Sequence, residues 1–343
     1  MNRNLREEIE LALAGGAPGR MPFTYYDLLT PPGFDLAPLQ ARGMAICARR
    51  AVWRKTYTEV DIRDYPEADG SIRTVFTTPV GVVTARRRAA PQGEAPLEHP
   101  IKVRDDYRVA RYIVDHTRYE PCYDMFAEDV RTLGDAGKVI AHTCYEPLLD
   151  LQIGWIGQEQ FCYELADNAD ALMELHEALV RNHRAMYEVV ARSPADYVLY
   201  GGNVVPSMLG PERVCDLVAP CWNAFADRLH EADKKIGCHL DADNSLILDV
   251  VKRSGLDFVE AFTPPPDCSV SVAAARAAWP EKRLWINFPS SVHLQSPDQI
   301  RAATREILEQ AGDRRGVLLG VTEDVPVDRM LPSFHAILDV LNE

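Results

Sequence analysis

The sequence lacks several features that would assign the protein to a specialised class. Its 343 residues contain no run of about 18 apolar residues, the minimum for a membrane-spanning helix. The eight cysteines include no CxxC pair and are spread too thinly for a disulfide framework. A glycine-rich phosphate loop and a GxSxG nucleophile elbow are also absent, which argues against P-loop enzymes and serine hydrolases. We therefore expect a folded chain whose cysteines are reduced.

Positive charge is scarce as well. Lysine and arginine total 37 against 51 aspartates and glutamates, which gives a formal net charge of −14. Extended contact with nucleic acid or with an anionic membrane needs clustered lysines and arginines. Neither partner is expected. The first residues combine helical periodicity with acidic side chains where a signal peptide would be apolar, so we predict a cytoplasmic protein.

The second half of the chain alternates short apolar runs with helix-length amphipathic segments. The predicted strands are residues 197–200, 236–240, 258–262, 284–288 and 317–321, and the helices that follow them are 211–233, 245–254, 270–278, 297–311 and 329–341. This repeat of about 30 residues is typical of parallel strands joined by crossover helices, and it favours a (β/α)8 barrel.

The first half fits the repeat less regularly. Residues 21–26 and 139–143 are predicted barrel strands, and residues 57–84 predict β-hairpins because VFTTPVGVVTAR places a Pro-Val-Gly turn between two β-rich arms. We predict an α/β fold: one (β/α)8 barrel domain over residues 1–343, with an N-terminal β-hairpin insertion. The hairpin and loop insertion occupies about residues 57–100 near the barrel mouth, and residues 89–100 form a turn-rich loop.

Polar residues follow several predicted strands at the end where a barrel carries its active site. In GCHLDADNS, His239 and Asp241 are two residues apart at the end of one strand and share a face. Glu260 ends the next strand, and Glu323 follows the last one. One imidazole and three carboxylates predict a divalent-metal site. The alternatives are metal-free acid/base chemistry and solvated loop acids.

Other candidates are individually weaker. Asp243 either caps the following helix or takes part in catalysis beside Glu260. Side chains expected to bind substrate, because they lie at predicted strand ends, are Tyr25, His142, Tyr200, Asn203 and Asn287. A packed aromatic is the alternative for Tyr25, and a hydrogen-bonded core histidine is the alternative for His142.

The stretch from Asp196 onward resembles the C-terminal half of uroporphyrinogen decarboxylase-like proteins. The resemblance rests on YGGNVVPSMLGPERVCDLVAPCWNAFADRLHEADKKIGCHLDADN, GLDFVEAFTPPP, INFPSSVHLQSPDQIRAATREIL and GVTEDVP. This superfamily of (β/α)8 barrels includes uroporphyrinogen decarboxylases, corrinoid-protein-linked methyltransferases and, more distantly, cobalamin-independent methionine synthase. The resemblance implies zinc ligands at His239, Asp241, Glu260 and Glu323. Asp241 and Glu323 stand where the methyltransferases have thiolates, which implies a harder ion better suited to a substrate oxygen.

The resemblance also orders the candidate functions. A true uroporphyrinogen decarboxylase has an N-terminal Arg-x-x-x-Arg motif that RGMAICARRAVWRK does not match, and an acidic cluster would repel a polycarboxylate. The leading prediction is a metal-dependent methyl or alkyl transferase-like enzyme acting on a small molecule, with zinc as the divalent metal. Its specific form is corrinoid-linked O-demethylation with a corrinoid protein as partner. A metal-free decarboxylase or lyase using paired carboxylates comes second, and a non-catalytic ligand-binding or corrinoid-binding accessory third. A homodimer is compatible with the resemblance.

Overall fold

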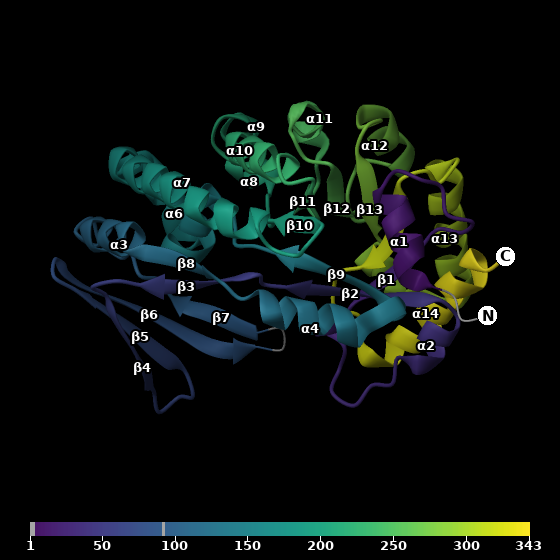
Figure 1. Ribbon diagram of the computed structural model, residues 1–343, viewed down its shortest axis with the longest axis horizontal. Coiled ribbons are helices and arrows are strands. Elements are labelled where there is room, and N and C mark those ends of the chain that lie inside the picture. Colours follow the sequence, from purple (N-terminus) through teal and green to yellow (C-terminus); the bar gives the residue numbers. More distant parts are fainter. Residues whose placement is uncertain (1–3, 91–92) are drawn as a thin grey trace. The chain divides into compact units, whose positions relative to one another are not determined.

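The computed structural model describes residues 4–90 and 93–343 (Figure 1). The chain packs into two compact units. Unit 1 comprises Met1–Ala51, Tyr123–Thr143 and Pro194–Glu343, and unit 2 comprises Val52–Cys122 and Cys144–Ser193. The chain therefore leaves unit 1 twice, after Ala51 and after Thr143. Residues 91 and 92, within the loop predicted at 89–100, lie outside the described residues.

Unit 1 contains a closed barrel of parallel strands in the order β1-β14-β13-β12-β11-β10-β9-β2, with β2 pairing back to β1. The barrel strands are β1 (Phe23–Tyr26), β2 (Met44–Arg50), β9 (Gly137–His142), β10 (Tyr197–Tyr200), β11 (Lys235–His239), β12 (Phe258–Phe262), β13 (Arg283–Asn287) and β14 (Val317–Val321). The fold is a (β/α)8 barrel, as the sequence predicted. Strands such as β12 and β14 are buried at every position, as parallel strands covered on both faces must be.

Helices connect the barrel strands on the outside. Those of unit 1 are α1 (Leu5–Leu13), η1 (Asp27–Leu29), α2 (Ala37–Ala41), α4 (Tyr123–Leu133), η2 (Gly134–Ala136), α8 (Pro206–Leu209), α9 (Pro211–Arg213), η4 (Val214–Val218), α10 (Ala219–His230), η5 (Ser245–Ile247), α11 (Leu248–Arg253), α12 (Val272–Ala278), η6 (Ser290–Leu294), α13 (Pro297–Ala311) and α14 (Val327–Leu341). Local sequence sets several of their ends. The Ser296 hydroxyl accepts a hydrogen bond from the Gln299 N–H, the Gln299 side chain accepts one from the Ser296 N–H, and Pro297 occupies the first turn.

The N-terminal helix α1 packs against the barrel interior. Its residues Leu5, Ile9 and Leu13 belong to one buried cluster with interior residues of the strands. The strand members of this cluster are Tyr26, Ala45, Cys47, Ile140, Leu199, Phe258, Trp285 and Leu318. The helix therefore excludes water from one end of the barrel core, and the other end is left for chemistry.

Unit 2 combines two antiparallel sheets with helices. Its strands are β3 (Trp53–Tyr57), β4 (Asp61–Pro66), β5 (Ile72–Thr78), β6 (Gly81–Ala90), β7 (Gly93–Glu98) and β8 (Thr117–Pro121), and its helices are α3 (Asp106–Asp115), α5 (Pro147–Asp150), η3 (Leu151–Ile156), α6 (Gln158–Asp167) and α7 (Ala169–Ala191). β3 pairs with β8, and β4 to β7 form a four-stranded meander. The predicted hairpin between two β-rich arms is confirmed as β5 and β6.

Two differences from the sequence-based expectation concern strands. Seven barrel strands are found where apolar runs predicted them, but β2 was not predicted. Its apolar run ends in two arginines and is not followed by a helix-length segment, so the βα repeat did not reveal it. In addition, residues 93–98 form strand β7 instead of part of a loop. No helix in the described part of the chain is both long and apolar enough to cross a membrane.

Candidate active site

The barrel interior changes from apolar to polar toward the carboxyl ends of its strands. Residues two apart on a strand share a face, so each apolar interior residue predicts the next interior position. Two residues beyond Cys47, Ile140, Phe258 and Trp285 of the apolar cluster are Arg49, His142, Glu260 and Asn287. These polar residues lie at the face where barrel enzymes carry their active sites.

A hydrogen-bonded chain of three side chains forms the centre of this layer. The Tyr26 hydroxyl donates to one carboxylate oxygen of Glu260. The other Glu260 oxygen lies 2.7 Å from Nδ1 of His239, which donates to it. His239 and Glu260 are register partners on the neighbouring strands β11 and β12, whereas Tyr26 comes from β1. Both oxygens of Glu260 are thus occupied, and the imidazole is held with its Nε2 directed elsewhere.

A bulge in β12 directly follows Glu260. The pairing between β12 and β13 shifts between Val259 and Phe262, and Ala261 has a φ of 58°. A left-handed backbone is strained for alanine, and β-bulges are common beside active sites because they redirect a side chain. The backbone oxygen of Glu260 also accepts from the Leu240 N–H at 2.8 Å, which ties the bulge to the segment after β11.

Charge on His239 is balanced by two carboxylates. Its Nε2 lies 3.6 Å from Asp241 Oδ2. Burial lowers the pKa of His239, but Glu260 and Asp241 outweigh burial and raise it to about 10. The pKa of Asp241 is lowered, because its interactions with His239 and with backbone N–H groups outweigh its burial. Burial and the neighbouring Asp241 raise the pKa of Glu323. Three carboxyl groups therefore surround one cationic imidazole.

Arg49 belongs to the same layer, although the sequence did not single it out. Its guanidinium carbon lies 4.0 Å from the centre of the Tyr26 ring. Burial lowers the pKa of Arg49, but its interactions with Tyr26 and Glu260 outweigh burial and raise it. The next residue, Arg50, forms an ion pair with Asp27. Had β2 been predicted, its alternation would have placed Arg49 in the interior two residues after Cys47.

Two predicted substrate-binding tyrosines face the surrounding helices instead of the interior. Tyr25 packs edge-on against Phe334, with ring centres 5.2 Å apart, and its hydroxyl donates to the Leu29 carbonyl. Tyr200 packs in the same way against Phe225 at 5.1 Å. Because adjacent residues on a strand point to opposite faces, the interior tyrosine at the end of β1 is Tyr26.

The other three predicted substrate-binding residues, His142, Asn203 and Asn287, lie in different environments. His142 lies in the polar layer, and burial, Arg49 and His239 lower its pKa to about 4. Asn203 is exposed on the loop after β10 and has a φ of 55°. Asn287 donates to the Thr263 hydroxyl at 3.2 Å and accepts from the Thr322 N–H at 3.0 Å, so both ends of its amide hold neighbouring loops.

Asp243 holds the loop that follows β11. Its two carboxylate oxygens accept from the backbone N–H groups of Ser245, at 2.8 Å, and Ser269, at 3.0 Å. These contacts outweigh its burial and lower its pKa to about 2. Asp243 therefore forms a turn with Ser245 just before η5, whose N-cap is Asn244, and a catalytic role for Asp243 stays a prediction.

The residues of the polar layer were tested for a metal site. Among the side chains that the structure describes, no group of three or more His, Cys, Asp or Glu residues is arranged to hold a metal ion. His239 and Asp241 nevertheless have a suitable separation. Two ligands of one tetrahedral zinc ion, each bound at about 2.1 Å, lie roughly 3.4 Å apart, close to the 3.6 Å between Nε2 and Oδ2. Glu260 occupies the position of a carboxylate that orients a metal-binding histidine through its other nitrogen.

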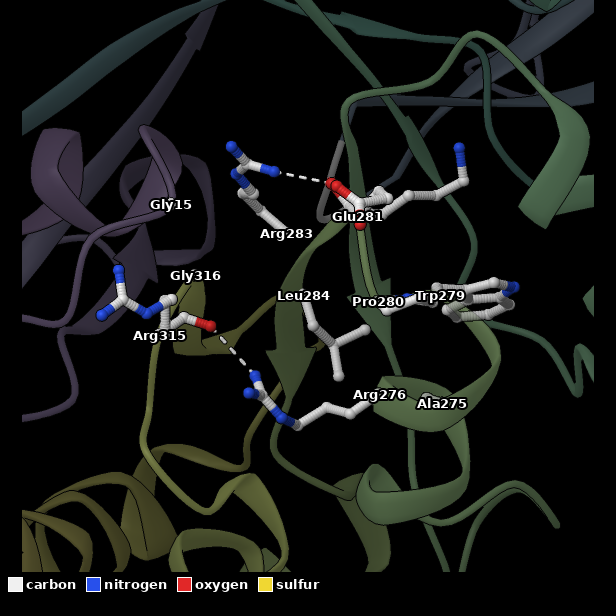
Figure 2. A pocket seen from close by; sticks show the side chains of 11 residues that line it. Gly15, Ala275, Arg276, Trp279, Pro280, Glu281, Arg283, Leu284, Arg315 and Gly316 are labelled. Atoms are coloured by element: carbon white, nitrogen blue, oxygen red, sulfur yellow. Dashed lines mark hydrogen bonds between the residues drawn. The ribbon is translucent and has the colours of Figure 1, made fainter.

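A cavity of about 340 Å³ lies away from this layer, at the amino ends of β13 and β14 (Figure 2). It is strongly basic, but its cations have structural partners. Arg276 pairs with Asp313 at 2.8 Å, and Arg283 donates to the backbone oxygens of Glu281 and Ala14. Lys282 donates to two further carbonyls, at 2.9 Å each. The amino-terminal face of a barrel serves stability, so we assign this cavity no chemistry.

Comparisons with known proteins agree with the fold. The family described as uroporphyrinogen decarboxylase (URO-D) matches residues 154–343. No curated protein matches the chain. Among solved structures, a methyltransferase from Methanosarcina mazei is similar with a TM-score of 0.61 and 11% identity, covering 98% of each chain. A glycoside hydrolase family 5 enzyme from Prevotella bryantii B14 has a TM-score of 0.48 and 10% identity, covering 98% of this chain and 99% of its own. At 11% identity, the likeness to the methyltransferase concerns the fold alone.

Proposed function

Because the chain belongs to the uroporphyrinogen decarboxylase (URO-D) family, we propose that it is an enzyme that transfers a methyl or alkyl group of a small molecule at the His239 site. The observation that carries this proposal is the chain Tyr26–Glu260–His239, which leaves Nε2 facing Asp241. A histidine fixed through one nitrogen, with the other aimed at a carboxylate, is built to hold an electrophile or to move a proton.

The residues that would hold a divalent ion are His239 through Nε2, Asp241 and Glu323, with Glu260 as the orienting partner or fourth ligand. When bound, such an ion, zinc in the first instance, supplies Lewis acidity toward an ether or hydroxyl oxygen. This donor set consists of one imidazole nitrogen and carboxylate oxygens and contains no sulfur, which fits an oxygen-bearing substrate. Burial and, after it, Asp241 raise the pKa of Glu323, and a cation bound next to Glu323 would favour its ionised form.

The remaining residues position this centre. Glu260 accepts a hydrogen bond from the Nδ1–H of His239 and thereby keeps the ring in one tautomer and one orientation. Tyr26 holds the second oxygen of Glu260, and Arg49 lies over the Tyr26 ring, where its charge opposes that of the carboxylates. In this proposal the methyl acceptor is a corrinoid carried by a partner protein, as in corrinoid-linked O-demethylation. Methyl transfer to a corrinoid protein would test that part separately.

Metal content tests the proposal directly. We expect near-stoichiometric divalent metal in wild-type protein purified without chelator, and its loss in a His239→Ala, Asp241→Ala double variant, measured by elemental analysis. Asp243→Ala is the matched control, because Asp243 lies on the same loop but holds backbone N–H groups. If the wild type contains no metal, or if the double variant retains it, the metal-dependent transferase is ruled out.

A metal-free decarboxylase or lyase is the second candidate, and one observation favours it. Without a cation, His239 has a pKa of about 10, because Glu260 and Asp241 outweigh its burial. It is therefore protonated at neutral pH and can donate a proton to a carbanion formed next to it. Glu323, whose pKa is raised by burial and Asp241, would be the paired carboxyl group. Turnover that survives exhaustive treatment with a chelator would support this candidate.

A further inference from the structure

Unit 2 presents one face of a two-stranded sheet to a cavity. In the antiparallel pair of β3 and β8, Lys55 is directly opposite Tyr119, and Tyr57 is opposite Thr117. Because side chains alternate along a strand, these four share one face. All four line a cavity of about 170 Å³. The alternate residues of both strands point to the other face, where Arg54 pairs with Glu120 at 2.8 Å.

The rest of the cavity wall is mainly apolar and comes from unit 2 alone. Its other lining residues are Phe76, Pro100, Ile113, Val114, Asp150, Gly154, Trp155, Leu179 and Asn182. They belong to β5, α3, α5, η3 and α7 and to the segment before α3. The volume is below the range of about 300–1,000 Å³ that is usual for drug-sized ligands, so the cavity suits a smaller molecule.

Two opposite charges face this cavity from different elements. Lys55 faces this cavity, and although part of its side chain is exposed, its ammonium is largely buried; it makes no direct hydrogen bond or ion pair among the residues that the structure describes. Asp150 is fixed by Trp155, whose indole N–H donates to Oδ2 at 3.2 Å. Gly154 permits the close approach of this carboxylate, because a Cβ there would lie 2.9 Å from Oδ1. Burial lowers the pKa of Lys55, but Asp150 and Cys144 outweigh burial and raise it, so the ammonium is charged at neutral pH.

We propose that this cavity is a binding site for a small organic carboxylate that has an apolar body and a hydrogen-bond donor. The carboxylate binds Lys55, the donor group binds Asp150, and the body packs between Trp155, Phe76 and Ile113. A lysine ammonium that makes no direct hydrogen bond and faces a mainly apolar wall gives a carboxylate a strong contact, because a charge-assisted hydrogen bond is stronger away from water. This inference does not depend on the reaction proposed for the barrel.

Binding of 4-hydroxybenzoate by isothermal titration calorimetry tests the inference, with two analogues that each remove one feature. 4-Hydroxybenzamide lacks the negative charge, and benzoate lacks the donor. We expect 4-hydroxybenzoate to bind most tightly, and Lys55→Met to weaken it by about 10- to 100-fold, the effect of losing one charged hydrogen bond. Arg54→Met is the matched control, because Arg54 is the neighbouring residue on the opposite face of the same strand.

The analogues and a second variant separate the contacts. Lys55→Met should have no effect on 4-hydroxybenzamide, and Asp150→Asn should reduce the advantage of 4-hydroxybenzoate over benzoate. Circular dichroism melting of each variant checks that unit 2 remains folded. Equal binding of 4-hydroxybenzoate and 4-hydroxybenzamide by the wild type, or unchanged binding in Lys55→Met, would overturn the proposal. Loss of metal binding or of turnover at His239 would not affect it.

Discussion

At the scale of single residues, the chemistry of this protein depends on how Glu260 holds His239. Glu260 is almost fully buried, and each of its oxygens has a different partner, Tyr26 or His239. A buried carboxylate in this arrangement cannot change one contact without disturbing the other. Gly202 adds a further constraint, because a Cβ at this position would lie 3.1 Å from the Cβ of His239. The imidazole is thus held by a hydrogen bond and by packing.

Glu260→Gln should weaken metal binding about 10- to 100-fold while leaving the fold intact. The amide replaces one carboxylate oxygen with an NH2 donor, so either Tyr26 or His239 loses its acceptor, and the His239 ring loses its fixed tautomer. Zinc titration calorimetry measures the affinity, and imidazole ¹⁵N shifts report the tautomer without requiring activity. Asp243→Asn serves as the control on the neighbouring loop. Wild-type affinity in Glu260→Gln would show that Glu260 does not position His239.

At the scale of elements, α1 and β12 have different tasks. β12 places Glu260 opposite His239 in regular register, and it departs from regular pairing just after Glu260, at Ala261. α1 covers one end of the barrel core, and its buried positions follow helical spacing at Leu5, Ile9 and Leu13. β12 thus serves the site, and α1 serves the stability of the barrel on which the site depends.

Ile9→Ala should lower the free energy of unfolding by about 2–4 kcal/mol, because Ile9 has no exposed surface and its removal leaves a cavity at the end of the barrel core. Leu11→Ala is the matched control on the same helix. The Leu11 side chain is 47% exposed, so its truncation should change stability by less than about 0.5 kcal/mol. Urea unfolding followed by circular dichroism measures both values. Equal losses in the two variants would mean that α1 does not cover the core as described.

At the scale of the whole molecule, buried histidines link stability to pH. Burial lowers the pKa of His293 in unit 1 to about 4 and that of His183 in unit 2 to about 3. His293 Nδ1 is 2.6 Å from the Ser333 hydroxyl. Above pH 6.5 these groups are neutral in both the folded and the unfolded chain, so their contribution to stability is constant. Below pH 6.5 the unfolded chain binds protons that the folded chain does not. The free energy of unfolding therefore decreases as the pH is lowered.

Replacing His293 with glutamine should reduce this acid sensitivity. Each such histidine costs up to about 1.4 kcal/mol per pH unit between pH 6.5 and its folded pKa. From pH 6.5 to pH 5, the wild type should therefore lose about 2 kcal/mol more than His293→Gln. Urea unfolding at pH 5, 6.5 and 8 measures the difference, and the pH 8 value separates the pH-independent cost of the substitution. Parallel pH profiles would show that His293 does not titrate between folded and unfolded states.

The sequence by itself determined much of the barrel and part of the site. Strand and helix periodicity is a local property, so the repeat in the second half predicted five βα units, and strand ends predicted the positions of His239 and Glu260. Their pairing follows from adjacent parallel strands. The family resemblance, which rested on the same half, agrees with the match over residues 154–343. Metal binding itself stays a prediction.

Only the tertiary structure decided which face of each strand points inward. Alternation shows which residues share a face, but closure of the barrel selects the face, so Tyr26 is in the centre and Tyr25 packs against a helix. Arg49 became visible only with β2, whose partners β1 and β9 are distant in sequence from one another. The cavity around Lys55 depends in the same way on long-range packing, because β3 and β8 bring together residues more than fifty positions apart in the chain.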